Sequence, residues 1–230
     1  MVEYRLRFSK EKNLKFLSHL ELIRTMERAF RRAQLPLVYS EGFHPHPKLS
    51  FGPALAVGIS SNDEYLDFQL VHDIAPEKIK TDLNQCLPDG IKTIAIVRFG
   101  THHHVKALNA IINRASYSVQ LKTTPENSSK VVEWLSQLIH LSEFIITRYS
   151  KDDQKLVNIR PWLHNLTIEV IDAQESILEL RFTGEIGSGG NLRPEDITAN
   201  IPYSVKILGV ARIGLWHEEK GSVSRPMDLC

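Results

Sequence analysis

Apolar and polar positions alternate with a period of two in residues 3–9, which predicts a half-buried strand. Its apolar members are Tyr4, Leu6 and Phe8. A spacing of three and four follows and predicts a helix that begins at Ser18, forms a capping box with Glu21 and ends before Pro36. The expected inward positions of this helix are Phe16, Leu20, Ile23, Met26 or Glu27, Phe30 and Ala33.

The same patterns continue to residue 99. Residues 54–60 and 65–70 are expected to form a hairpin around a turn at 61–63. Pro76 is expected to open a second helix, and residues 91–99 return to the alternation of a strand. The resulting order, β-α-β-β-α-β, is that of the split βαβ arrangement of ferredoxin-like domains.

A similar order begins again near residue 117. It comprises strands at 117–121 and 144–149 around a helix at 125–141, an antiparallel pair at 166–171 and 177–182, a helix at 194–200 and a strand at 203–213. We therefore expect an α+β protein made of two tandem ferredoxin-like units with antiparallel sheets. The first unit would span residues 1–100 and the second residues 116–230. A linker at 101–115 would carry a histidine run at 102–104.

Overall charge excludes a strong global field, because 28 Lys and Arg stand against 27 Asp and Glu. The charge is uneven, however, since residues 1–50 carry ten basic and five acidic side chains. No apolar run reaches the length of a membrane helix, and the first residues do not resemble a signal peptide. Two cysteines, Cys86 and Cys230, cannot build a disulfide framework, so we expect a cytoplasmic protein.

The loop at residues 42–53, GFHPHPKLSFGP, concentrates residues that can carry chemistry. His44 and His46 are two positions apart, and on an extended segment both imidazoles could reach one metal ion. A third ligand could come from His19, Asp67 or the histidine run at 102–104. None of them stands at a typical metal-site spacing, so the sequence predicts no metal site, with His44 and His46 as the candidates if one exists. A catalytic use of His19 or His46 beside Lys48 is also open. No nucleophile or paired carboxylates accompany them, which favours binding over catalysis.

A row of arginines on the first predicted helix offers a site for phosphates. Arg24, Arg28 and Arg31 lie three and four residues apart, and Arg32 follows. Phe43 and Phe51 in the loop are expected to supply rings on which an unpaired base can stack. The alternative is a solvated helix face whose arginines pair locally with Glu21 and Glu27.

Two stretches of the second half are further candidates. A glycine-rich turn with Gly189, Gly190 and Arg193 precedes a predicted helix, where free backbone N–H groups could cradle an anion; the alternative is an ordinary turn that caps the helix. Arg160 lies in an apolar, proline-stiffened setting, where it needs either an internal carboxylate or a ligand as partner.

Five of these segments together resemble a known bacterial family. They are FLSHLE at 16–21, the arginine-rich helix that ends with RRA at 31–33, YSEGFHPHPKLSF at 39–51, NIRP at 158–161 and GGNLRPE at 189–195. They look like the radical-SAM-linked domain family of unknown function, whose members are encoded beside, or fused to, cobalamin-binding radical SAM proteins. The family usually has Asn at the position of His44 and Asp at those of Glu21 and Asn158, and the first departure weakens the metal hypothesis further.

The resemblance implies a cobalamin-binding radical SAM protein as partner. The chain itself has no Cys-x3-Cys-x2-Cys motif to hold the cluster of such an enzyme, and we predict no cofactor for it. Two ferredoxin-like units with a basic first half are also similar in element order to CRISPR repeat-processing endoribonucleases.

These observations favour an accessory module that binds RNA, either tRNA or rRNA, for a radical-SAM enzyme. Two alternatives remain: a metal-independent endoribonuclease or RNA-modifying enzyme that uses His19 or His46, and a subunit that only docks on the radical-SAM protein.

Overall fold

The computed structural model describes residues 1–99, 106–149 and 153–230. It confirms an α+β protein with antiparallel strands, and it divides into two compact units. The first unit comprises Met1–Asn113 together with Gly214–Cys230, and the second comprises Arg114–Ile213. The C-terminal residues from Gly214 therefore belong to the first unit, whereas the sequence pattern places them in the second. The histidine run at 102–104 lies outside the described residues.

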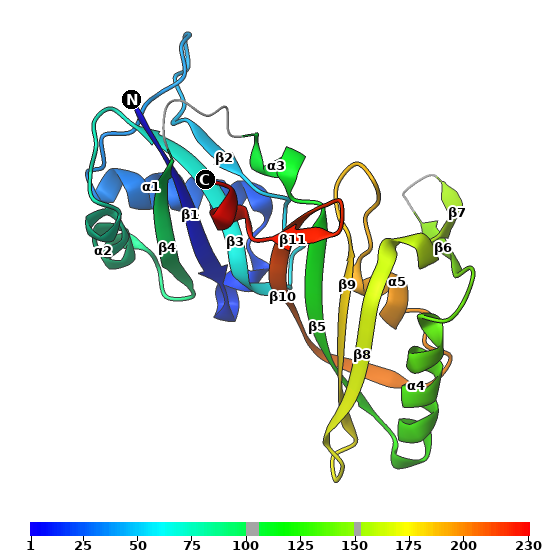
Figure 1. Ribbon diagram of the computed structural model, residues 1–230. Helices are drawn as coiled ribbons and strands as arrows, with labels where there is room; N and C mark the ends of the chain where they lie inside the picture. The colour runs from blue at the N-terminus through cyan, green and yellow to red at the C-terminus, as the bar shows by residue number, and fades with distance from the viewer. Residues whose placement is uncertain (100–105, 150–152) are drawn as a thin grey trace. The chain divides into compact units, whose positions relative to one another are not determined.

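The first unit has a sheet with helices on one face (Figure 1). Strand β1 (Val2–Lys10) pairs antiparallel with β3 (Ser60–Leu70) and with β4 (Ile91–Phe99), and β2 (Leu49–Phe51) pairs with β3. Helices α1 (His19–Arg32) and α2 (Pro76–Cys86) bury their apolar sides against this sheet. The shared core contains Tyr4, Leu6, Phe8, Leu22, Met26, Phe30, Leu66, Phe68, Ile79 and Leu83.

Polar side chains line the other face of the same strands, as the period of two requires. The register places Glu3 opposite Gln69 and Arg5 opposite Asp67. Arg5 is fully buried because it donates to both carboxylate oxygens of Asp67, at 2.7 and 2.8 Å, and to the carbonyl oxygen of Pro226 at 2.7 Å. A 3₁₀ turn, Pro226–Leu229, supplies that carbonyl.

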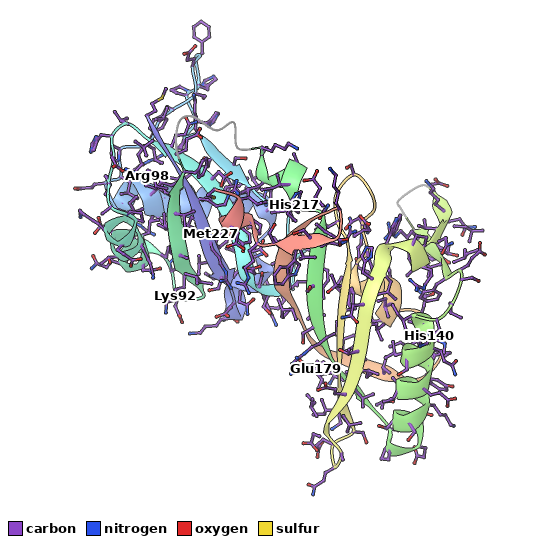
Figure 2. The ribbon with its side chains drawn as sticks, in the orientation of Figure 1. Lys92, Arg98, His140, Glu179, His217 and Met227 are labelled. Atoms are coloured by element: carbon purple, nitrogen blue, oxygen red, sulfur yellow. The ribbon has the colours of Figure 1, made fainter. Side chains whose placement is uncertain are left out.

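The C-terminal segment of the first unit contains the last residues of β10 (Val205–Glu219), followed by β11 (Ser222–Ser224). The backbone N–H of Leu215 donates to Asp63 at 2.8 Å, and Nδ1 of His217 lies 2.6 Å from the carbonyl oxygen of Ile111 in α3 (Leu108–Ile111). His217 and Met227 mark this segment in Figure 2. These contacts are long-range, so local sequence patterns do not record them.

The second unit has β5 (Arg114–Thr123) between β10 and β9 (Ile177–Glu185), with β8 (Leu163–Asp172) on the outer side of β9. Helix α4 (Pro125–Leu138) contacts β8, and α5 (Pro194–Thr198) precedes β10. The predicted strand at 144–149 is β6 (Ile145–Tyr149), and it pairs with β7 (Gln154–Asn158), which the sequence pattern does not predict.

Two sequence predictions in the first unit are wrong. Residues 54–60 do not form a strand, because the partner of β3 is β2, and the predicted turn at 61–63 lies within β3. Phe16 and Leu20 are 59% and 55% exposed, since the face of α1 that meets the sheet begins at Leu22. None of the helices in the described residues combines the length and apolar character needed to cross a membrane.

Candidate functional site

Helix α1 positions a row of cations on the exposed side of the first unit. The Ser18 hydroxyl accepts from the Glu21 backbone N–H at 3.3 Å, and the Glu21 carboxylate accepts from the Ser18 backbone at 2.8 Å, which confirms the predicted capping box. The hydrogen bond from the Ser18 side chain lowers the pKa of Glu21. With its apolar side on the sheet, the helix exposes Arg24, Arg28 and Arg31 to solvent.

The four predicted arginines do not share one environment. Arg32 donates to the carbonyl oxygen of Cys86 at the end of α2, so it ties the two helices together. Within the described residues, Arg24, Arg28 and Arg31 have no hydrogen-bond or ion-pair partner. Of the predicted row, these three cations are available to an anion.

Residues 33–48, the central loop, connect α1 to β2 within the first unit and project from the sheet (Figure 1). Its two arms are held together because the Ser40 N–H donates to the His46 carbonyl oxygen, and the Lys48 N–H donates to that of Val38, both at 2.8 Å. The Ser40 hydroxyl also accepts from the His46 backbone N–H at 3.0 Å. Residues 41–46 at the tip are exposed, and Phe43 is fully so.

The two aromatic rings predicted to stack on a base differ in solvent exposure. Phe43 presents its ring to solvent at the loop tip. Phe51 is only 9% exposed, and it packs edge-on against Phe8 and against His19, whose ring centroid lies 5.6 Å away. Phe51 therefore belongs to the core and does not offer the exposed face that base stacking requires.

The predicted histidines are not brought into a catalytic arrangement. His19 contacts Phe51 at the start of α1, while His46 is exposed in the loop. Among the described residues, no hydrogen bond or ion pair links the side chain of either histidine to a carboxylate or to Lys48. The same described residues contain no group of three His, Cys, Asp or Glu side chains that could hold a metal, which leaves His44 and His46 without a third ligand there.

A pocket of about 290 Å³ opens on the polar side of the first unit. Its lining comprises Glu3, Lys48, Leu49, Ser50, Asp67, Phe68, Gln69, Phe99 and Ala107. Lys48, Leu49 and Ser50 continue the central loop into β2, so the loop and the pocket share residues. Burial raises the pKa of Asp67, while its hydrogen bonds with Arg5 act in the opposite direction.

Sequence reasoning missed Glu3, Gln69 and Phe99 as site residues, and it considered Asp67 only as a possible third metal ligand. The signal that could have found them was the alternation itself, because it places Glu3 and Arg5 on one face of a predicted strand and Asp67 and Gln69 on one face of another. What it lacked was the pairing of these two strands.

In the second unit, Arg160 is held by hydrogen bonds to backbone carbonyl oxygens. Its guanidinium donates to the carbonyl oxygens of Ile139, Leu141 and Leu163, at 2.5, 2.9 and 2.8 Å. Ile139 and Leu141 follow directly after α4, where helix carbonyls lack intrahelical donors. The predicted need for a partner is thus met by backbone, and neither of the two partners the sequence suggested, a carboxylate or a ligand, is required.

Residues of the second unit also make hydrogen bonds with the glycine-rich turn. The backbone N–H of Arg193 donates to the Asp196 carboxylate at 2.8 Å, and that of Leu192 donates to the Glu185 carbonyl oxygen. Gly190 packs so closely on Trp162 that a Cβ there would lie 2.4 Å from the indole ring. Because Asp196 accepts from the backbone N–H of Arg193, that N–H is not available to an anion, and the anion cradle at Gly189, Gly190 and Arg193 stays a prediction.

Sequence comparison places the chain in a family. Residues 3–194 match the family described as uncharacterized protein conserved in bacteria (DUF2344), and the chain belongs to it. No protein with a curated description matches the sequence.

Two solved structures are similar in backbone. One is a chain of a Cbf5–Nop10–Gar1 complex, with a TM-score of 0.49 and 10% identity over 92% of this chain and 48% of that chain. The other comes from the archaeal box H/ACA sRNP Nop10–Cbf5 complex, with a TM-score of 0.44 and 10% identity over 98% and 52%. This chain spans about half the length of each.

Proposed function

We propose that this chain is an accessory module that binds RNA through α1 and the central loop. The observation that carries the proposal is the exposed arginine row, Arg24, Arg28 and Arg31, which has no partner within the described residues. An arginine whose guanidinium makes no hydrogen bond or ion pair keeps its full set of donors for a phosphate, which it binds bidentately. The alternative of a helix face paired locally is thereby disfavoured.

The central loop supports the same role. Phe43 offers an exposed ring, and His46 and Lys48 add exposed polar groups on the arms beside it. Pro45 and Pro47 restrict the backbone of His44 and His46 to extended conformations, which lowers the entropy lost on binding. Stacking of an unpaired base on an aromatic ring, with phosphates held by nearby cations, is the usual mode of single-strand recognition.

A binding experiment with a matched control tests the proposal. We expect Arg24→Ala combined with Arg28→Ala to weaken binding of a labelled single-stranded RNA about tenfold. Loss of two phosphate contacts should also reduce the slope of log affinity against log salt by about 1.4. The control, Lys130→Ala with Lys155→Ala, removes two exposed cations from the second unit. Fluorescence anisotropy over a salt series measures both quantities, and equal behaviour of the two double variants would contradict the proposal.

We propose further that the RNA is tRNA or rRNA and that the partner is a cobalamin-binding radical SAM protein, on the family resemblance. Exposed apolar side chains, Phe16 and Val57, offer a docking contact beside α1. Crosslinking in cells with sequencing of the bound RNA identifies the substrate. Co-purification after RNase treatment tests direct docking, and its loss in Phe16→Asp would support this contact. Failure of the wild-type proteins to co-purify would argue against the partner.

We also propose that both units are ferredoxin-like. The first has the order β1-α1-β2-β3-α2-β4 with β4-β1-β3 adjacent and β2 on β3, and the second has β10-β5-β9-β8 adjacent. In this proposal the β6–β7 hairpin is an insertion into the second unit. An experimental structure of the chain checks the strand orders.

A cytoplasmic location is part of the proposal, because Cys86 and Cys230 are free thiols.

A further inference from the structure

The pocket on the polar side of the first unit has a composition that the arginine row does not explain. Its charged and amide groups are Glu3, Asp67, Gln69 and Lys48, and Phe99 contributes an apolar wall. At about 290 Å³ it is at the lower end of the range of small-molecule pockets, roughly 300–1,000 Å³, which suits one planar base.

Hydrogen-bond acceptors dominate its polar surface. The Gln69 side chain donates through Nε2 to the Glu3 carboxylate at 2.6 Å. Because an ionised carboxylate only accepts, this contact fixes the amide orientation and leaves Oε1 as a free acceptor. That Oε1 is buried and has no hydrogen-bond partner within the described residues. A buried acceptor without a donor is costly, so a donor on a ligand would relieve it.

The charges around the pocket favour a neutral ligand over a metal ion. Arg5 lies behind Asp67 and engages both of its oxygens, so that carboxylate is already neutralised. Lys48 adds a second cation to the lining. A divalent ion would be repelled by these two groups, whereas a neutral base with two donors and one acceptor would satisfy Glu3, Gln69 and Lys48 together.

We propose that this pocket binds a single unpaired guanine of the RNA. Guanine alone among the four RNA bases presents two adjacent donors, N1–H and N2–H, which fit one carboxylate; Glu3 takes this role. The Gln69 oxygen accepts from the second N2–H, and Lys48 donates to O6. The inference rests on the proposed RNA-binding function, and it adds a base preference to it. Because Lys48 belongs both to the loop and to the pocket, RNA held by the loop lies next to the pocket mouth.

RNA oligomers test the preference. The probes are oligouridylates of about nine nucleotides with one central G, A or C, a length within the usual single-strand site size. We expect the G oligomer to bind at least about fivefold more tightly than the A and C oligomers, as one bidentate pair provides. Glu3→Gln should remove this preference, while Glu77→Gln, which changes an exposed carboxylate of α2, should keep it. Equal binding of the three oligomers by the wild type would overturn the inference and leave the RNA proposal intact.

Free nucleotides separate the pocket from the arginine row. In NMR titrations with guanosine and adenosine 5′-monophosphate, we expect shifts of the Glu3 and Gln69 backbone signals with the guanosine nucleotide only. Lys48→Met should weaken this binding without affecting the fold, and thermal melting checks the stability of each variant. Guanosine monophosphate binding without any RNA binding would support the pocket and refute the proposed function. No shift at millimolar guanosine nucleotide would refute the pocket.

Discussion

The exposed arginine row of α1 and two arginines of the second unit differ in what their guanidinium groups contact. In the second unit, Arg160 donates to three carbonyl oxygens, and Arg148 donates to Asp196 while it lies 5.1 Å from the Trp162 ring. On α1 of the first unit, Arg24, Arg28 and Arg31 have no such partners within the described residues. An arginine in a sequence motif is therefore a ligand candidate only when the fold leaves its donors unused.

The largest expected effect is on the stability of the second unit. Arg160→Met removes the donors of three carbonyl oxygens, some of them at the C-terminal end of α4. We expect the free energy of unfolding to fall by about 3 kcal/mol, because unsatisfied carbonyls lose their compensation. Urea denaturation measures the change.

Arg28→Met is the matched substitution in the exposed arginine row of α1. An exposed arginine without a partner should contribute within about 0.5 kcal/mol, as surface substitutions do. Similar losses of unfolding free energy from Arg28→Met and Arg160→Met would contradict the distinction between an exposed arginine and one that binds backbone carbonyls.

A second test concerns the glycine-rich turn. Gly190→Ala places a methyl group within 2.4 Å of the Trp162 ring, so we expect a loss of about 1–3 kcal/mol through overpacking. Gly209→Ala is the control, because a Cβ at Gly209 meets nothing within 4 Å. If Gly190→Ala lowered the melting temperature no more than the control, the close contact between Gly190 and Trp162 would be contradicted. Thermal melts of both variants decide the question.

The loop tip should matter for binding and not for folding. Phe43→Ala removes a fully exposed ring, so we expect an unchanged melting temperature. RNA affinity should fall by about tenfold, the equivalent of one lost stacking contact of about 1–3 kcal/mol. Phe51→Ala should do the reverse and destabilise the first unit, because Phe51 lies in its core. Anisotropy and melting curves of the two variants sharpen the contrast.

The smallest effects concern pH, and they have opposite signs in the two units. In the first unit, burial raises the pKa of Asp67 above its usual 3.8. Its contribution to stability is therefore fully present below that value and is lost as pH rises through the folded-state pKa. In the second unit, a hydrogen bond from Ser118 lowers the pKa of Glu179, a residue labelled in Figure 2, from 4.5. Its contribution is present above that value and is lost as pH falls.

Two variants isolate these signs. From about pH 6 to about pH 3, the stability gap between wild type and Asp67→Asn should move in favour of the wild type, whereas the gap for Glu179→Gln should move against it. Denaturation at several pH values measures both gaps. Slopes of the same sign would contradict the opposite directions of the two pKa shifts.

Local patterns predicted much of the first unit and part of its site. The alternation in β1, the capping box of α1 and the spacing of Arg24, Arg28 and Arg31 are properties of a few neighbouring residues, and all of them agree with the structure. The loop tip with Phe43 was predicted because glycine and proline determine it locally. The second unit was harder to predict, because residues 154–158 show little alternation of apolar and polar positions that could indicate strand β7.

Spacings of two to four residues were enough to predict most of the helices and strands and the apolar face of β1, but they placed a strand at 54–60 that does not form and missed β7. Only the tertiary structure decided that Phe51 is buried, that Arg160 serves backbone carbonyls and that the residues from Gly214 belong to the first unit. It also brought Glu3 and Gln69 together on one side of a pocket, 66 positions apart in the chain. The partners of a polar side chain are chosen by contacts across such separations, and no local pattern records them.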